Sequence, residues 1–160
     1  MRRLAQVGDL DAVFAICMHE SVVPFLGHDP MPLETFRGVF LALFASGSFF
    51  VFEHEGELAG FYKTTRFPGR AAHVVQLGTL AVAPQFQGRG VAKAMLDDAV
   101  QRLRADGVKR IELIVEGDNA RGIAFYKRLG FEIEGTLKKF YKRSHQDHYV
   151  DDHVMARIFD

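Results

Sequence analysis

The stretch LAVAPQFQGRGVA, residues 80–92, decides the fold, because an apolar strand passes there almost directly into an apolar helix. Residues 73–82 read as the strand, since they are mostly apolar and bounded by turn residues. The helix carries an apolar stripe at helical spacing, formed by Ala92, Leu96, Ala99, Val100 and Leu103. Gly107 is suited to end it, and residues 111–115 form a short apolar strand. This strand, helix, strand unit predicts a right-handed parallel crossover.

The turn inside this unit has a composition suited to anion binding. A helix start offers free backbone N–H groups and the positive end of the helix dipole. Gly88 and Gly90 would let a bulky anion such as phosphate approach that backbone. The spacing Gln-x-x-Gly-x-Ala is neither the dinucleotide GxGxxG pattern nor the GxxxxGK[ST] phosphate loop. An ordinary glycine-rich helix entry fits these residues equally well.

The rest of the chain alternates between helical and strand patterns. Before the crossover we expect a strand over 2–6, a helix capped by Asp9, a loop over 21–32, a helix over 33–45, and strands over 49–54 and 58–66. After it we expect a helix that Gly130 stops and strands over 131–142 and 148–158. The order predicts an α/β (α+β mixed) fold: one domain with a mostly antiparallel mixed sheet and helices on both faces.

Composition narrows the function classes. The 160 residues fit one domain, and 48% apolar residues are enough for a packed core. Lys plus Arg and Asp plus Glu both number 20, so we expect neither a nucleic acid nor a membrane partner. Cys17 is the sole cysteine, and residues 1–13 lack the apolar stretch of a signal peptide, which favours a cytoplasmic setting. The apolar run 39–52 is interrupted at Ser46-Gly47-Ser48 and is too short to span a bilayer.

A second block of sequence gives the turn a context. NARGIAFYKRLGF, residues 119–131, follows LAVAPQFQGRGVA in the order and spacing of the GCN5-related N-acetyltransferase (GNAT) family, which this chain resembles. Gly122 stands where that family usually has alanine. The resemblance implies an N-acetyltransferase domain over residues 1–160, acetyl-CoA (coenzyme A) as cosubstrate and no metal. It also implies a parallel strand pair, splayed at the cofactor site by a bulge for which Gly78 is suited.

The same resemblance assigns the cofactor-binding residues. Backbone N–H groups of the turn would hold the pyrophosphate, in the run Gln87, Gly88, Arg89, Gly90, Val91 and Ala92. Arg89 would add charge at the rim or be only an exposed arginine. Leu80 and Val82 would supply main-chain contacts, and the Leu80 N–H is the expected oxyanion donor.

Tyr126 is the expected general acid. It follows Asn119 by two helical turns, so both face the same way about 10 Å apart. The alternative for Tyr126 is a core aromatic ring with a satisfied hydroxyl group. Asn119 is expected to contact the cofactor, to cap its helix, or both.

The base that removes a proton from the acceptor amine is less defined. Many family members carry a carboxylate near the position of Gln76, and an amide cannot act as a base. Glu116 is our candidate, with His73 and a chain of water molecules as alternatives. For each of these side chains taken singly, a structural role is favoured over a catalytic one.

The acceptor is expected to be a small-molecule amine. Residues 131–159 resemble a branch of the family that acts on free L-amino acids or related amines, although Ser144 to Asp147 replace its usual short turn. In the family, the loop within residues 17–44 lines the acceptor pocket, where Glu20 or Asp29 could hold an ammonium group.

Three alternatives stay open. They are a protein N-terminal or lysine acetyltransferase, a non-catalytic acyl-CoA-binding module, and a metal site in HQDHYVDDH, residues 145–153. Alternation along a strand separates these His and Asp side chains onto two faces, which disfavours a tetrahedral site. The resemblance is also compatible with a homodimer.

Overall fold

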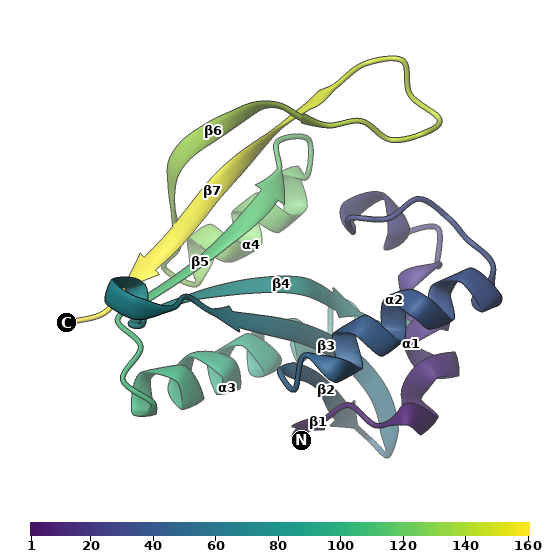
Figure 1. The fold of residues 1–160 in the computed structure, drawn as a ribbon, viewed down its shortest axis with the longest axis horizontal. Helices are drawn as coiled ribbons and strands as arrows, with labels where there is room; N and C mark the ends of the chain where they lie inside the picture. Colours follow the sequence, from purple (N-terminus) through teal and green to yellow (C-terminus); the bar gives the residue numbers. More distant parts are fainter. The chain divides into compact units, whose positions relative to one another are not determined.

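The computed structural model describes residues 1–160 and contains four α-helices and seven strands (Figure 1). The helices are α1 (Leu10–Cys17), α2 (Leu33–Ala45), α3 (Val91–Ala105) and α4 (Ala120–Arg128). The strands are β1 (Arg2–Leu4), β2 (Phe49–His54), β3 (Glu57–Arg66), β4 (Val74–Val82), β5 (Arg110–Glu116), β6 (Glu132–Tyr141) and β7 (Val150–Ile158). None of the helices combines the length and the apolarity needed to cross a bilayer.

The strands follow the order β1-β2-β3-β4-β5-β7-β6. The pairs β1–β2, β2–β3, β5–β7 and β6–β7 are antiparallel, whereas β4 and β5 run parallel. This topology confirms the predicted mixed, mostly antiparallel sheet and the parallel connection through α3. The parallel register joins Val74, Val75 and Gln76 to Arg110, Ile111 and Glu112, while β4 itself continues to Val82. The splay of this pair stays a prediction.

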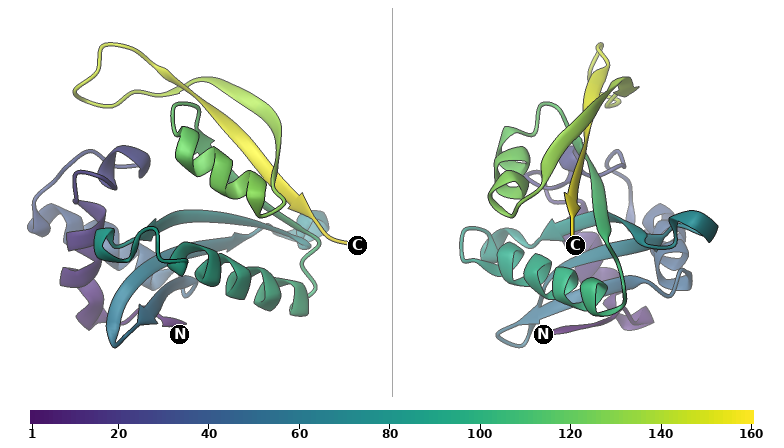
Figure 2. Two further views of the ribbon diagram at one scale, coloured as in Figure 1. Left: turned by 180° about the vertical axis from the view of Figure 1, so that it is seen from behind. Right: turned by 90° about the vertical axis from the view of Figure 1, so that its left-hand side faces the viewer.

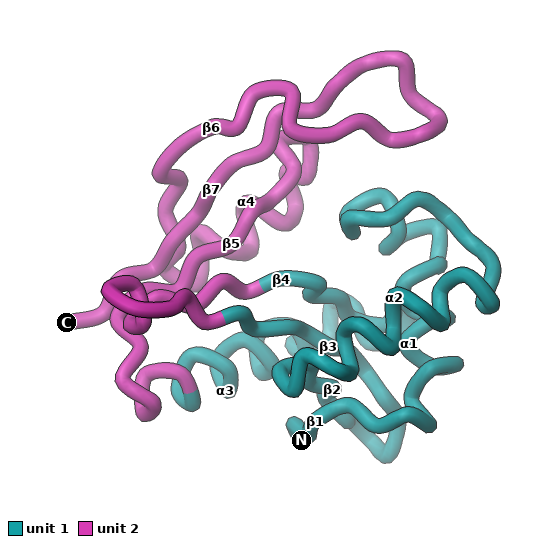
Figure 3. Tube along the Cα trace, viewed as in Figure 1, with its two compact units in different colours: residues 1–65, 78–102 teal, residues 66–77, 103–160 magenta.

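The chain divides into two compact units, drawn in different colours in Figure 3. Unit 1 comprises residues 1–65 and 78–102, and unit 2 comprises residues 66–77 and 103–160. The boundary passes through β4, so the glycine-rich turn belongs to unit 1 and α4 to unit 2. The prediction of one functional domain over residues 1–160 stays a prediction.

Helices cover both faces of the sheet in unit 1 (Figure 2). On one face, the Phe49 ring lies 6.3 Å from Phe40 of α2 and 5.5 Å from Phe61 of β3. On the other face, the Phe50 ring stacks on Tyr62 at 5.4 Å, and the Arg102 guanidinium of α3 lies 4.4 Å above Phe50. Alternate residues of β2 therefore serve two separate apolar layers, as a strand covered on both faces requires.

In unit 2, β5 has an apolar face and a polar face. Ile111, Leu113 and Val115 are buried on the first. Because successive side chains alternate between faces, Glu112 and Glu116 share the second. Phe131 is fully buried just after α4, and its ring lies 5.8 Å from that of Tyr126. Tyr126 of α4 is thus half-buried, with its ring against the buried Phe131.

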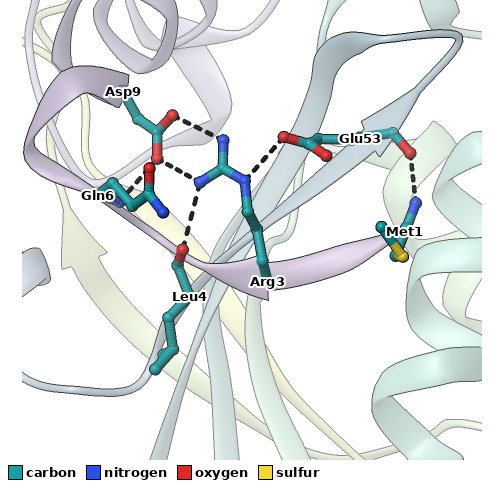
Figure 4. Close-up of polar contacts among 6 residues, drawn as sticks. All are labelled: Met1, Arg3, Leu4, Gln6, Asp9 and Glu53. Carbon is teal, nitrogen blue, oxygen red and sulfur yellow. Dashed lines mark hydrogen bonds and ion pairs between the residues drawn. The ribbon is translucent and has the colours of Figure 1, made fainter.

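The N-terminal strand is held by an ion-pair network rather than by the helix cap that the sequence suggested (Figure 4). The Asp9 carboxylate accepts hydrogen bonds from Arg3 at 2.8 and 2.9 Å and from the Gln6 backbone N–H at 2.7 Å. Arg3 also donates to Glu53 at 2.7 Å. Asp9 does immediately precede α1, but its side chain makes no capping bond to that helix, because its oxygens are already engaged.

Candidate functional site

The glycine-rich turn of unit 1 has the backbone that the sequence predicted. A short 3₁₀ turn at Pro84–Phe86 leads through residues 87–90 into α3, which starts at Val91. Gly88 and Gly90 have φ angles of 73° and 80°, in the left-handed region that favours glycine. A Cβ atom at either position would meet no atom within 4 Å, so the space beside both backbones is open. The turn therefore brings an accessible backbone to the start of a helix, where N–H groups lack intrahelical partners.

Gln87 contacts the rest of the protein through both its side chain and its backbone N–H. The Gln87 amide donates to the Val82 carbonyl oxygen at 3.1 Å, and the Gln87 N–H donates to the Pro84 carbonyl at 3.2 Å. Gln87 thus ties the turn to the end of β4, and its own N–H is engaged. The N–H groups that follow it, from Gly88 to Ala92, make up the rest of the predicted anion site.

Arg89 lies at the edge of the turn, as expected, but it has a partner. Its guanidinium lies 5.2 Å above the Phe86 ring and donates to both carboxylate oxygens of Glu55 at 3.1 Å. Both members of this ion pair are largely exposed, so the pair contributes little to stability. An arriving anion would compete with Glu55 for this cation.

β4 contains one residue in the left-handed region, Thr79, with φ of 47°. It follows Gly78, whose predicted role in a bulge stays a prediction. A β-branched residue is rarely found in the left-handed region, and such backbone strain costs about 1–3 kcal/mol. Thr79 immediately precedes Leu80, whose N–H was the predicted oxyanion donor. Sequence reasoning missed Thr79, because threonine is an ordinary strand residue and gives no signal for a positive φ.

In unit 2, α4 begins at a well-formed cap. The Asn119 side chain accepts a hydrogen bond from the Gly122 N–H at 2.9 Å, which confirms the capping part of its prediction. A Cβ at Gly122 would lie 2.5 Å from the Asn119 amide nitrogen, so the usual family alanine would displace this side chain. The Asn119 amide also lies 3.5 Å from Glu116 Oε2 at the end of β5. The cap therefore links the start of α4 to the candidate base.

Glu116 has the electrostatic properties of a general base. Burial raises its pKa to about 7, and the negative charge of Asp152 acts in the same direction. Its own backbone N–H, Asn119 and Arg143 act in the opposite direction but do not cancel the effect. A carboxyl group with a pKa near the working pH is suited to accept and release protons. Glu116 was the candidate on sequence grounds, and its environment in unit 2 fits that role.

Tyr126 stays protonated well above neutral pH. Burial, and then the charge of Glu116, raise the pKa of its phenol above the usual range. The ring packs against Phe125 and Phe131 at centroid distances of 5.3 and 5.8 Å. The phenol therefore carries a proton at neutral pH, and its packing does not conflict with the predicted role as a proton donor, which stays a prediction.

The other residues that the sequence suggested for the base or the acceptor pocket are mostly exposed. His73 and Glu20 are exposed, and so is Asp29 in the loop between α1 and α2. Gln76 lies in the paired part of β4, opposite Glu112. No three His, Cys, Asp or Glu side chains converge in a way that could hold a metal ion. Cys17 is buried, and burial raises the pKa of its thiol to about 12, so it is a poor nucleophile.

Comparison with known sequences identifies the family. Residues 15–131 match the profile of the Acetyltransferase (GNAT) family, and this range contains both motif blocks. The match takes in well over half of the chain. The chain therefore belongs to this family of acyltransferases.

Individual relatives point to different acceptors. The chain is 43% identical over 93 residues to the L-amino acid N-acetyltransferase AaaT of Escherichia coli K12, covering 56% of this chain and 54% of that protein. It is 39% identical over 99 residues to the mycothiol acetyltransferase of Saccharomonospora viridis, covering 58% of this chain and 32% of that protein. The chain thus spans about half the length of the first of these relatives and a third of the second.

A solved structure resembles the whole chain. The ribosomal-protein-alanine N-acetyltransferase from Brucella melitensis superimposes with a TM-score of 0.79 at 26% identity, covering 99% of both chains. Its fold supports the predicted α/β class. Its name refers to a protein substrate, whereas the name of the Escherichia coli relative refers to L-amino acids.

Proposed function

We propose that this chain transfers the acetyl group of acetyl-CoA directly to the primary amine of a small molecule, such as a free amino acid. Family membership and the Escherichia coli relative support the reaction and the acceptor class. The observation that carries the proposal is the state of Glu116, whose pKa is raised to about 7 by burial. A primary alkylamine is protonated at neutral pH, so transfer requires a group that can remove its proton.

The glycine-rich turn fits the phosphate groups of acetyl-CoA. Gly88 and Gly90 hold the backbone in a conformation that other residues rarely adopt, and open space lies beside both. In our proposal the N–H groups from Gly88 to Ala92 bind the pyrophosphate, and Gln87 fixes the turn. The main chain at Leu80 and Val82 binds the rest of the cosubstrate, and the Leu80 N–H stabilises the oxyanion. Acetyl-CoA supplies the activated acyl group as a thioester.

Glu116 and Tyr126 complete the proton balance. Glu116 takes a proton from the ammonium group, and the electron pair stays on nitrogen, which forms the new C–N bond. The C–S bond breaks, and Tyr126 donates its proton to the leaving thiolate. The thiol has a pKa near 8.5, below that of a phenol, so this proton donation is favourable only with help from the geometry and environment of the site. The nitrogen then releases its second N–H proton, which returns through solvent to the Tyr126 phenolate, so the amide and the tyrosine both end neutral. Asn119 positions the start of α4 in this scheme, so that the Glu116 carboxyl and the Tyr126 hydroxyl keep their places.

The transfer needs no covalent enzyme intermediate in this proposal. Cys17 is the sole cysteine, and its buried thiol has a pKa of about 12. Thiolate, not thiol, is the nucleophilic form. Direct attack by the amine is therefore the simpler route.

A protein or peptide acceptor is the second candidate, because the structural relative from Brucella melitensis is named for a ribosomal protein substrate. Thiol release from acetyl-CoA, measured against L-amino acids, polyamines, and lysine or N-terminal peptides, distinguishes the two. Release with free amino acids supports our proposal. Release with peptides alone keeps the reaction and overturns the acceptor class. Acetyl-CoA binding without thiol release from any amine overturns the catalytic proposal and indicates a binding module.

A further inference from the structure

Strand register places a second carboxyl group directly opposite Glu116. In the antiparallel pair β5–β7, Glu116 faces Asp152. Side chains of directly opposed residues share one face of a sheet, with Cβ atoms about 5 Å apart. The Gly117 N–H donates to the Asp151 carbonyl at 2.8 Å and holds the end of β5 against β7. A Cβ at Gly117 would collide with that carbonyl oxygen, so glycine permits this close approach.

Asp152 is buried and incompletely satisfied. Only 4% of its surface is exposed, and its Oδ1 atom has no hydrogen-bond partner. The Tyr141 hydroxyl of β6, next to β7, is a second buried polar atom without a partner. Buried polar atoms nearly always have partners, so two orphans around one carboxyl pair indicate a polar ligand.

The side chains around Glu116 and Asp152 carry an excess of negative charge, which favours the binding of a cation. Arg143 binds Asp118 through two hydrogen bonds of 2.7 and 3.1 Å, and its side chain is 8% exposed. With Glu116, Asp152 and Asp118 ionised against Arg143 alone, three negative charges minus one positive charge leave two negative charges. Burial, and then Asp118, raise the pKa of Asp152 to about 6. Without a further cation, the pair retains a proton near neutral pH.

The other polar groups around the pair do not remove this imbalance. Asn119 and the Tyr126 and Tyr141 hydroxyls are uncharged at neutral pH, while Asp151 adds negative charge. His153 lowers the pKa of Asp152 while Asp151 raises it, so their effects oppose each other, and the His153 ring lies 3.0 Å from the Thr136 hydroxyl. A positively charged ligand with N–H donors could donate hydrogen bonds to Asp152 Oδ1 and the Tyr141 hydroxyl oxygen, and it would also balance the excess negative charge.

We propose that Asp152 is a second carboxyl group of the acceptor site, and that Glu116 and Asp152 together receive the ammonium group of the acceptor amine. This inference rests on the proposed function. One N–H bond of the ammonium breaks and one O–H bond forms on Glu116, while Asp152 stays ionised and holds the nitrogen. The pair selects alkylamines, which are cations at neutral pH, over neutral arylamines and alcohols.

The first test uses the free protein without any substrate. Carboxyl carbons of Glu116 and Asp152 are followed by ¹³C NMR as the pH is raised, in the wild type, in Asp152→Asn and in Asp151→Asn. We expect the Glu116 midpoint near 7 to fall by about half a unit or more in Asp152→Asn, because a like charge is lost. Asp151→Asn removes the same charge from the neighbouring position and keeps an oxygen for the Lys139 N–H, so it should leave Glu116 unchanged. An unchanged midpoint in Asp152→Asn overturns the inference.

The second test uses steady-state kinetics with the most active amine of the acceptor panel. Asp152→Asn is expected to raise KM for the amine about tenfold, the equivalent of one charge-assisted hydrogen bond, with a smaller loss of kcat and no change in KM for acetyl-CoA. Tyr141→Phe removes the orphan hydroxyl without changing charge and should raise the same KM by a smaller factor. A loss of kcat at unchanged amine KM in both variants overturns the inference.

The outcomes separate the inference from the function on which it rests. Thiol release by the wild type, with no coupling of the two carboxyl groups, overturns the inference alone. Coupled titration without thiol release from any amine overturns the proposed function, and the acceptor role of Asp152 falls with it.

Discussion

The glycine-rich turn of unit 1 and the carboxyl cluster of unit 2, formed by Glu116, Asp118 and Asp152, are suited to binding in two different ways. The turn presents backbone, in a conformation that depends on Gly88 and Gly90, and its side chains serve mainly to hold that backbone. The cluster presents side chains, and its character depends on burial and on the charges opposite Glu116. The first is sensitive to shape, and the second is sensitive to pH.

This difference determines which substitutions should matter. At Gly88 or Gly90, a change to any residue with a Cβ introduces strain, and a negative charge there adds repulsion of phosphate. In the cluster, an isosteric change that removes a charge should preserve the fold and alter the chemistry. From the largest expected effect to the smallest, the variants below change the turn, then the carboxyl cluster and its proton donor, and last a stabilising contact outside both regions.

Gly90→Glu should abolish detectable acetyl-CoA binding, with a loss of at least about 100-fold. The left-handed φ of 80° is unfavourable for glutamate, and its charge would face the pyrophosphate. Isothermal titration calorimetry measures the loss directly. Gly107→Glu is the matched control, because Gly107 at the other end of α3 has φ of 81° and lies outside the turn. Normal binding by Gly90→Glu would remove the pyrophosphate assignment.

Glu116→Gln should lower kcat about 100-fold, a usual effect for loss of a general base. In the wild type, activity should fall as pH drops below about 7, since the raised pKa means that the carboxylate is lost there. In the variant the limb near pH 7 should disappear and leave only the loss of the Asp152 charge near pH 6, while acetyl-CoA affinity stays unchanged. A pH profile of kcat/KM measures both effects. Glu112→Gln is the control, because Glu112 lies on the same face of β5 and pairs with Arg110 at 2.7 and 2.9 Å. An acidic limb that stays near pH 7 in Glu116→Gln would point to another base.

These two variants also show what the sequence could and could not predict. The turn was predictable, because glycine spacing at a helix start has a direct meaning for the backbone. The order of helices and strands along the chain and the parallel crossover were predictable from hydrophobic periodicity, whereas the order of the strands within the sheet was not predicted. Asp152 gave no signal, since its burial and its position opposite Glu116 depend on the register of β5 against β7. Thr79 gave none either, because its φ is imposed by the fold around it.

Tyr126→Phe should lower kcat at least about tenfold and leave acetyl-CoA affinity unchanged, because only the proton donor is lost. The ring contacts with Phe125 and Phe131 remain in the variant, so its melting temperature should stay close to that of the wild type. Single-turnover thiol release separates this chemical effect from cosubstrate binding. Tyr149→Phe is the control, since Tyr149 is 58% exposed. Equal turnover by Tyr126→Phe and the wild type would leave Tyr126 with packing alone.

Asp9→Ala should change neither acetyl-CoA binding nor acetyl transfer. It therefore tests whether a stabilising contact outside the two regions can be lost without loss of either function. It removes two hydrogen bonds to Arg3 and one to the Gln6 N–H, at a cost of about 1–3 kcal/mol. The expected fall in melting temperature is about 2–10 °C for a domain of this size. Burial alone would raise the pKa of Asp9, but Arg3 and the Gln6 N–H lower it overall.

The pH dependence of this loss follows from the lowered pKa. A carboxyl group with a depressed pKa in the folded state stabilises the protein above its ordinary pKa of 3.8, and this stabilisation is lost as pH falls further. Wild type and Asp9→Ala should therefore differ most at pH 7, and the difference should shrink as pH falls below 3.8, which thermal melts followed by circular dichroism can measure. Asp11→Ala is the control, because Asp11 is an exposed acid in the first turn of α1. A large loss of kcat in Asp9→Ala at a temperature where it is fully folded would contradict the separation, since it would connect the N-terminal network to the chemistry.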